Sequence, residues 1–500
     1  MKQLLSTTTL LLLTLIGFGQ TTAIPDNNFE QRLIDLGYDD VLDGVVLTEN
    51  INSLITIDVA GQEISDLTGI EDFEMLEGLF CSTNDLVTID LSENSNLETL
   101  VLGYNNLTTL NLSENTNLKT LSCDNNNLTD IDLSGNTNLV KLYIVENAGI
   151  TSLDLSSNTL VEEIYARDCD LTEIDLTGCI NLRILDISSN DLPAIDFSTC
   201  VALADLICSE NPLSDIDLSA NTALIKVVAK DCGLADLNLD GLTVLSVLNC
   251  AINDLETLEL SDNANLQELI INSNDIVELD LTVATNLLVF ECYDNDIVEL
   301  DLTALNELKV FNCGLNPLNT LDVTENDSLV SLAIRQLPEG AVVHLDLSDK
   351  PNLAALICMQ NEGLVSVDLK NGNTESVVSI IGHSCPKFVC LQVEDEEYVI
   401  DNWFLNLDIQ TEVSEFCGLN IENSILNLTS VYPIPATNQL NVETDQEMTY
   451  QLLSISGKVV KSGILTVGVN SITVSNFPKG IYFIQLSNDA EKTTHKVVFK

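Results

Sequence analysis

One apolar pattern recurs along most of this chain at a nearly constant spacing. The pattern Leu-x-x-Leu-x-Leu-x-x-Asn-x-Leu-x-x-Leu-x-Leu runs from Leu97 to Leu112, and it returns 21 residues later from Leu118 to Leu133. One such turn cannot bury its apolar face alone, whereas stacked turns share a continuous core. The sequence therefore predicts an elongated solenoid. The first apolar position occurs about fifteen times, at Leu54, Leu76, Leu97, Leu118, Leu139, Val161, Leu182, Leu203, Leu224, Leu245, Leu266, Leu287, Leu308, Leu329 and Leu353.

Each turn opens with alternating apolar residues, which is typical of a short strand with one buried face. A second apolar pair, such as Ile131 and Leu133, predicts short strands on the other side of the turn. A recurring Asn suits a buried amide that satisfies loop backbone groups left unpaired by the strands. Cys169 and Cys232 replace this Asn twice. The Asn column comprises Asn84, Asn105, Asn126, Asn147, Asn190, Asn211, Asn253, Asn274, Asn295 and Asn316.

With this register held from about Leu54 to Leu369, the chain resembles the leucine-rich repeat family. The resemblance implies a β-rich horseshoe whose concave face is a parallel sheet. We assign the repeats to residues 53–371. The family includes bacterial adhesins and internalin-like proteins, which points to the binding of another macromolecule.

Both ends of the chain carry segments that do not follow the repeat. Residues 1–23 contain an apolar stretch that is too short to cross a bilayer, so they predict a secretory signal peptide cleaved after Gln20 or Ala23. No other stretch approaches twenty apolar residues, and we expect no transmembrane segment. Because a solenoid needs capped ends, we predict an N-terminal cap at 24–52 and a C-terminal cap at 372–420.

The charge balance excludes several classes of partner. The chain has 19 Lys and Arg against 77 Asp and Glu, a net charge of −58. Nucleic acids and anionic lipid surfaces are bound by basic patches, so we expect neither as a partner. Because 45% of the residues are hydrophobic, the charge must decorate a folded body rather than a disordered chain.

The last 70 residues differ from the repeats. A linker at 421–430 precedes residues 431–500, where short alternating runs separated by turns predict a small antiparallel β-sandwich. This tail resembles the C-terminal sorting domain of the type IX (Por) secretion system of certain Gram-negative bacteria, although Ile434 replaces the family's usual Asn. The matching residues include Pro433, Pro435, Gly457, Lys458, Gly480 and Tyr482.

The resemblance of the tail implies passage across the outer membrane of a Gram-negative bacterium. We therefore expect a protein that is secreted or held on the outer cell surface. An ordinary immunoglobulin-like module is the alternative interpretation of the tail.

The fourteen cysteines do not form an evident disulfide framework. Most occupy inward core positions of the repeat, where a thiol acts as a small apolar filler. Cys385, Cys390 and Cys417 lie outside that pattern, and two of the three can pair. No Cys-x-x-Cys pair exists, and only three His residues are present, so we expect no transition-metal site.

Calcium is the one metal that the sequence leaves open, and we expect no cofactor. Asp39-x-x-x-Asp43-Gly44 resembles half an EF-hand loop, but Val41 and Asn50 replace two expected acidic ligands. A column of carboxylates also recurs in the repeats, either as a solvated outer face or as a Ca²⁺ ladder. Its members are Asp90, Asp132, Asp154, Asp175, Asp196, Asp217, Glu259, Asp280, Asp301, Asp322, Asp346 and Asp368.

The residues that face outward from the predicted concave strands are the candidate binding site. Several are apolar or aromatic, and a monomer seldom exposes such a run without a partner. High strand propensity alone is the competing explanation. The candidate residues are Val101, Tyr104, Tyr143, Tyr165, Ile207, Val228, Ile270 and Tyr293.

No catalytic motif stands out, because the chain lacks G-x-S-x-G, H-E-x-x-H and glycine-rich phosphate loops. We therefore predict a monomeric, non-enzymatic protein that binds a host or envelope protein through its concave face. The alternatives are a surface protein that binds or degrades glycans and a structural spacer of the envelope.

Overall fold

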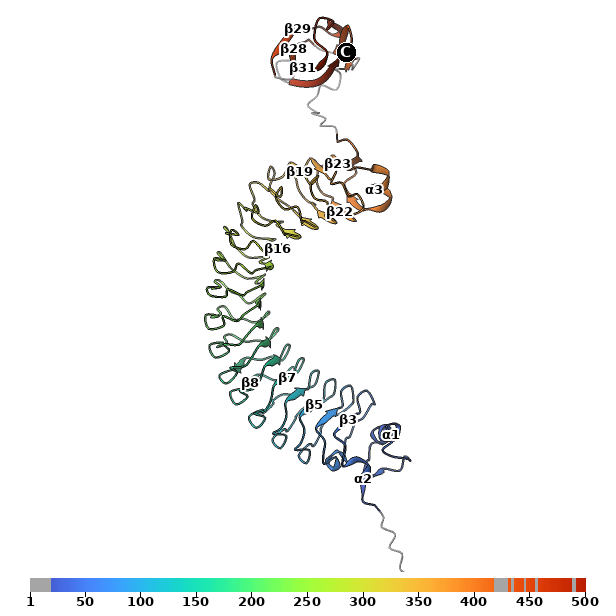
Figure 1. Ribbon diagram of the computed structural model, residues 1–500, viewed down its shortest axis with the longest axis vertical. Helices are drawn as coiled ribbons and strands as arrows, with labels where there is room; N and C mark the ends of the chain where they lie inside the picture. Colours follow the sequence, from blue (N-terminus) through green and yellow to red (C-terminus); the bar gives the residue numbers. More distant parts are fainter. Residues whose placement is uncertain (1–18, 418–429, 433–435, 445–446, 455–456, 488–491) are drawn as a thin grey trace, which may run out of the picture. The chain divides into compact units, whose positions relative to one another are not determined.

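The computed structural model describes residues 19–417, 430–432, 436–444, 447–454, 457–487 and 492–500 (Figure 1). The chain divides into two compact units, residues 1–414 and 415–500. The first holds the repeats and the second holds the tail, and each has its own hydrophobic core. No helix in the described residues is long and apolar enough to cross a membrane.

A small cap precedes the repeats. It contains β1 (Thr21–Ala23), α1 (Asn27–Asp35), β2 (Val45–Leu47) and α2 (Thr48–Ile51). Strand β1 pairs antiparallel with β2, and the buried Thr22 hydroxyl contacts the hydroxyl of Thr48 at 2.9 Å. The sequence assigned residues 21–23 to the signal peptide, whereas the structure includes them in the folded cap. Cleavage after Gln20 keeps this strand, and cleavage after Ala23 removes it.

Seventeen short strands stack in register as an open parallel sheet along the inner edge of the repeat unit (Figure 1). The strands are β3 (Thr56–Asp58), β4 (Gly78–Phe80), β5 (Thr99–Val101), β6 (Thr120–Ser122), β7 (Lys141–Tyr143), β9 (Glu163–Tyr165), β11 (Ile184–Asp186), β12 (Asp205–Ile207), β13 (Lys226–Val228), β14 (Val247–Asn249), β15 (Glu268–Ile270), β16 (Val289–Glu291), β17 (Val310–Asn312), β18 (Ser331–Ala333), β20 (Ala355–Ile357), β22 (Ser379–Gly382) and β24 (Phe404–Leu407).

The sheet is two strands longer than the repeat count from the sequence. Strands β22 and β24 lie in residues 372–420, where the sequence predicted only a cap. The intervening helix α3 (Glu396–Asn402) breaks the 21-residue spacing, which is why the periodic pattern does not reveal them. The solenoid therefore continues almost to the end of the first unit.

Short strands also form on the outer side of some turns, as the second apolar pair predicts. One pair joins β8 (Ser152–Asp154) with β10 (Glu173–Asp175). A four-stranded parallel sheet, ordered β19-β21-β23-β25, lies near the end of the unit. Its strands are β19 (His344–Asp346), β21 (Ser366–Asp368), β23 (Cys390–Gln392) and β25 (Glu412–Ser414).

The predicted Asn column is buried and fully bonded. Asn126 donates through Nδ2 to the carbonyls of Leu102 (3.1 Å) and Cys123 (2.9 Å), and its Oδ1 accepts from Leu107 N (3.0 Å). Each Asn thus ties its own turn to the preceding one and satisfies loop groups outside the strand ladder. This confirms the role inferred from the sequence.

A second buried Asn column lies toward the outer side of the turns, and the sequence analysis missed it. Asn136 donates to the carbonyls of Leu112 (3.2 Å) and Asn115 (3.0 Å) in the preceding turn. Its buried Oδ1 has no partner among the described residues. The same state holds for Asn94, Asn115, Asn158, Asn221, Asn263 and Asn326.

The second unit consists of two antiparallel sheets around one core, which agrees with the predicted β-sandwich. One sheet is ordered β26-β27-β30 and the other β29-β28-β31-β32. The strands are β26 (Ser430–Tyr432), β27 (Gln439–Thr444), β28 (Met448–Ser454), β29 (Val459–Leu465), β30 (Gly468–Thr473), β31 (Gly480–Ser487) and β32 (Lys492–Phe499).

Candidate functional site on the inner sheet

Six of the eight predicted binding residues share one position of the inner sheet. Each is the third residue of its strand, where the side chain points away from the core and is partly exposed. The in-register pairing places these side chains in one column along the sheet, about 4.8 Å apart from strand to strand. They are Val101, Tyr143, Tyr165, Ile207, Val228 and Ile270.

Tyr104 and Tyr293 do not belong to this column. Tyr104 lies in the loop after β5, has a positive φ of 57° and is 62% exposed. Tyr293 follows β16, and its hydroxyl lies 3.4 Å from Nη1 of Arg335, two turns further along. Gly314 stands in the intervening turn, where a Cβ would lie 2.8 Å from the carbonyl oxygen of Arg335. The absence of a side chain there lets Arg335 pass close to the sheet.

Tyr143 and Tyr165 form the best-defined feature of the column. Their rings stack with centroids 5.0 Å apart and an interplanar angle of 6°. The Tyr143 hydroxyl donates to Glu163 Oε2 (3.0 Å), and Lys141 Nζ lies 2.8 Å from Glu163 Oε1. The hydrogen bond from Lys141 holds the pKa of Glu163 below its usual value. The pair is therefore a rigid, half-buried aromatic patch with a neutralised edge.

Positive charge is concentrated on this same face. Residues 53–371 contain ten Lys and Arg residues, and eight lie on the inner strands or beside their ends. Lys119 and Lys141 pair with carboxylates of neighbouring turns, whereas Arg183, Lys226 and Lys230 have no ion-pair partner among the described residues. The eight residues are Lys119, Lys141, Arg167, Arg183, Lys226, Lys230, Lys309 and Arg335.

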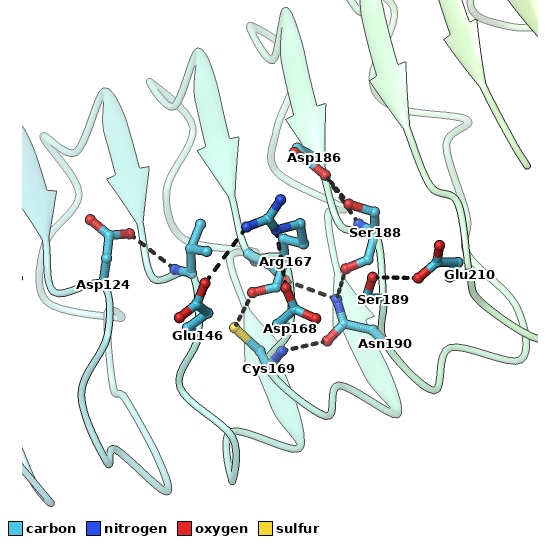
Figure 2. Close-up of polar contacts among 12 residues, drawn as sticks. Asp124, Glu146, Arg167, Asp168, Cys169, Asp186, Ser188, Ser189, Asn190 and Glu210 are labelled. Carbon is cyan, nitrogen blue, oxygen red and sulfur yellow. Dashed lines mark hydrogen bonds and ion pairs between the residues drawn. The ribbon is translucent and has the colours of Figure 1, made fainter.

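A polar rim borders the sheet where the strands end (Figure 2). Arg167 lies between two carboxylates, with Nη2 3.7 Å from Glu146 Oε1 and Nε 3.1 Å from Asp168 Oδ2. Further along, Ser189 Oγ donates to Glu210 Oε2 (2.9 Å). An apolar and aromatic centre with a polar border is the usual anatomy of a protein-binding surface.

The backbone of this rim is unusual. One non-glycine residue in each of fifteen turns has a φ between 52° and 62°, a region that costs most side chains some energy. The neighbouring Asn column holds the loop in this shape through its hydrogen bonds. The residues are Thr83, Tyr104, Asn125, Glu146, Asp168, Ser189, Glu210, Asp231, Ile252, Ser273, Asp294, Leu315, Gln336, Gln360 and Ser384.

The carboxylate column of the outer side has a local explanation. Asp132 Oδ1 accepts hydrogen bonds from the backbone N (2.9 Å) and hydroxyl (2.6 Å) of Ser134, and these bonds lower its pKa. The same bond to the residue two positions later recurs at Asp217 and Asp301. Asn111 makes it equally well in its own turn, to Ser113. The column therefore stabilises turns without needing a cation.

Twelve of the fourteen cysteines are buried free thiols, which confirms the inferred core packing. Burial raises the pKa of Cys250 and Cys179 to about 12, so these thiols are unreactive in the folded chain. Cys390 and Cys417 are disulfide-bonded, as expected for two of the three cysteines outside the pattern. No cluster of three or more His, Cys, Asp or Glu residues in the described parts of the chain could hold a metal ion.

The predicted sorting residues lie in turns and at strand ends of the second unit. Gly457 has a φ of 75° and closes the turn between β28 and β29. Gly480 begins β31, and the buried Tyr482 stacks on Phe499 at 4.6 Å. Lys458 follows Gly457 in the same turn, where its carbonyl accepts from Ser454 N (2.9 Å). Pro433 and Pro435 lie outside the described residues.

Comparison with solved structures places the repeat fold. The functional domain of InlJ from Listeria monocytogenes, whose description includes a cysteine ladder, is 22% identical, with 96% of this chain and 99% of that chain covered and a TM-score of 0.58. A leucine-rich repeat protein of Leptospira interrogans is 19% identical over 73% of this chain and 97% of its own, with a TM-score of 0.61.

A plant receptor kinase ectodomain, GASSHO1/SCHENGEN3 of Arabidopsis thaliana in complex with CASPARIAN STRIP INTEGRITY FACTOR 2, has a TM-score of 0.55. It is 21% identical, with 73% of this chain and 45% of that chain covered. Residues 430–500 match the family model described as the secretion system C-terminal sorting domain. The chain is an exported leucine-rich repeat protein. No curated protein matches its sequence significantly.

The sequence analysis of this repeat protein found the inner column but missed its charge. The signal was present, because the cations recur at the positions that flank or occupy the strands of each turn. Net charge for the whole chain hid it, since the outer side and the loops carry most of the acidic residues.

Proposed function

We propose that this exported protein binds a protein partner through the inner sheet and acts as an adhesin- or internalin-like recognition module. The carrying observation is that the stacked Tyr143–Tyr165 pair, the apolar column and eight of the ten repeat cations share one face. Nothing in the repeat architecture requires that concentration. Seventeen strands give a surface about 80 Å long, which is ample for a standard protein interface.

The charges describe the partner. The acidic body attracts a protein of net positive charge over a distance that salt shortens. On contact, Arg183, Lys226 and Lys230 offer unpaired cations, so the partner should present carboxylates to the centre of the sheet. The sorting domain supports display on the outer surface of a Gram-negative cell or release from it, and the proposal treats the protein as a monomer.

A capture experiment tests this proposal. The exported chain retains partners from surface extracts or host proteins, and a variant with Tyr143, Tyr165 and Val228 changed to Asp should lose at least tenfold in affinity. Ile180→Asp with Val201→Asp is the matched control, because both residues are more than half exposed but lie outside the inner sheet. Equal capture by the two folded variants would refute the proposal.

Glycan binding is the second candidate, and the tyrosine pair is the observation in its favour. Sugars pack on the open faces of aromatic rings, whereas the facing sides of Tyr143 and Tyr165 cover each other. The remaining edges suit a protein side chain better than a sugar ring. Binding on a glycan array that the triple Asp variant abolishes would reverse this preference.

A further inference from the structure

The loop between α1 and β2 in the N-terminal cap gathers acidic groups. Asp39, Asp40 and Asp43 lie within five residues, and Gly44 follows with a φ of 84°. The loop is drawn in at its start, where Asn50 Nδ2 donates to the Tyr38 carbonyl (2.9 Å). In the EF-hand comparison Asn50 stands at a ligand position, but the structure uses it to hold the loop closed.

Helix α1 places a fully buried carboxylate beneath this loop. Glu30 is 0% exposed, and its Oε1 accepts hydrogen bonds from the backbone N of Asp43 (2.8 Å), Gly44 (2.5 Å) and Val45 (3.2 Å). Its second oxygen, Oε2, is buried and has no partner among the described residues. A buried, unpaired carboxylate oxygen is costly, and proteins compensate it with a cation or a proton.

Asp39 has the same defect. Its Oδ2 is also buried without a partner in the described residues. Burial, followed by the charges of Glu30, Asp40 and Asp43, raises the pKa of Asp39. The only basic residue between positions 24 and 52 is Arg32, whose Nε donates to the Asp58 carbonyl (3.0 Å). The chain therefore places no cation of its own in the cap to balance these groups.

We propose that this loop is a Ca²⁺ site, with Glu30 Oε2 and Asp39 Oδ2 as its two buried ligands. Every available donor is an oxygen, which suits a hard cation, and Ca²⁺ accepts backbone carbonyls and water beside carboxylates. Three carboxylates are not already gathered around one point in the described residues. Binding therefore draws the exposed Asp40 or Asp43 inward and tightens the loop.

The position gives the ion a structural role. Loop 36–45 leads into β2, which pairs with β1 and covers the first turn of the repeats. Solenoids open from their ends, so a cap fixed by Ca²⁺ protects the whole stack. Glu30 lies nine residues before Asp39, outside the spacing of a loop motif, and this separation hid the site from the sequence.

Calorimetric titration of the chelator-treated exported chain with CaCl₂, in about 0.15 M NaCl to screen its acidic surface, tests the site. We expect one equivalent to bind and to raise the Tm. Asp39→Asn should weaken binding at least tenfold, whereas Asp132→Asn, an exposed carboxylate of the repeats, should leave it unchanged. Terbium should give luminescence on excitation of Tyr38, which lies next to Asp39, and lose it in Asp39→Asn.

Glu30→Gln keeps an acceptor for the three amides and should lose the ion as well. If that variant does not fold, Asp39→Asn alone decides the question. The proposal is overturned if the wild-type chain binds no Ca²⁺ or if Asp39→Asn binds it equally well. It is also overturned if Asp39→Asn raises the Tm equally with and without Ca²⁺ while the wild type is indifferent to the ion, because a shared proton then explains the buried oxygens.

Discussion

The inner and outer faces of each turn carry polar residues for different reasons. On the outer face, an Asp followed two residues later by Ser or Thr recurs in most turns, and each carboxylate accepts from its own turn. On the inner face, the third strand position changes from Tyr165 to Asp186 to Ile207 in successive turns. The outer pattern is required by the fold, whereas the inner variation is not. The inner face is therefore where selection for a partner can act.

The largest effect should come from a residue that both faces depend on. Asn126→Ala leaves three buried backbone groups unpaired, so we expect a loss of about 3–5 kcal/mol in the free energy of unfolding. Chemical denaturation measures it. Asn126→Cys should be milder, because Cys169 fills the same position and donates to Ile144 O (3.1 Å). Equal losses for Ala and Cys would contradict this account of the column.

The next effect should separate binding from stability. Tyr143→Ala with Tyr165→Ala should weaken partner binding at least tenfold, about 1.4 kcal/mol or more. Loss of the stacked pair should cost the fold only about 1 kcal/mol. Affinity and denaturation measurements on the same samples test both values. A variant that loses stability but keeps affinity would show that the pair serves the sheet rather than a partner.

Acid should act on the outer face. Hydrogen bonds lower the pKa of the Asp132, Asp217 and Asp301 carboxyls in the folded chain. Their stabilisation is complete above the unfolded value of about 3.9 and is lost as pH falls through the lower folded values. Thermal melts between pH 7 and pH 2 should therefore show their steep fall only below about pH 4. A steep fall already between pH 7 and pH 5 would contradict the assignment.

The smallest effect should come from a single outer carboxylate. Asp322 accepts from Thr324 N (3.0 Å) and is almost fully exposed, so Asp322→Ala should cost about 0.5 kcal/mol. Asp322→Asn keeps the acceptor and should be neutral, since Asn111 and Asn238 make the same bond. Neither change should alter partner affinity, which a binding assay on both variants checks.

Periodicity made the repeats, the first Asn column and the inner strand positions predictable from the sequence. It could not reveal contacts that break the period. Strands β22 and β24 were missed because α3 intervenes, and Glu30 was missed because it reaches its loop from a preceding helix. Residues 21–23 were assigned to the signal peptide because their pairing with β2 is not local.

Spacing also conceals how well a buried group is bonded. Asn126 and Asn136 are both buried residues that recur every turn, yet only Asn126 uses its oxygen. For the inner face, the sequence gives the positions of Tyr143 and Tyr165, while the stacking of their rings and the Glu163 contact require the side chains in three dimensions.

The free thiols distributed along the stack make each region of the molecule its own reporter. A sealed thiol such as Cys81 near the first turn or Cys358 near the last escapes alkylation until its turn opens. Labelling of the native protein followed by mass spectrometry would thus map, turn by turn, where the molecule breathes. With a partner bound, the same map would show how far along the stack the engagement is felt.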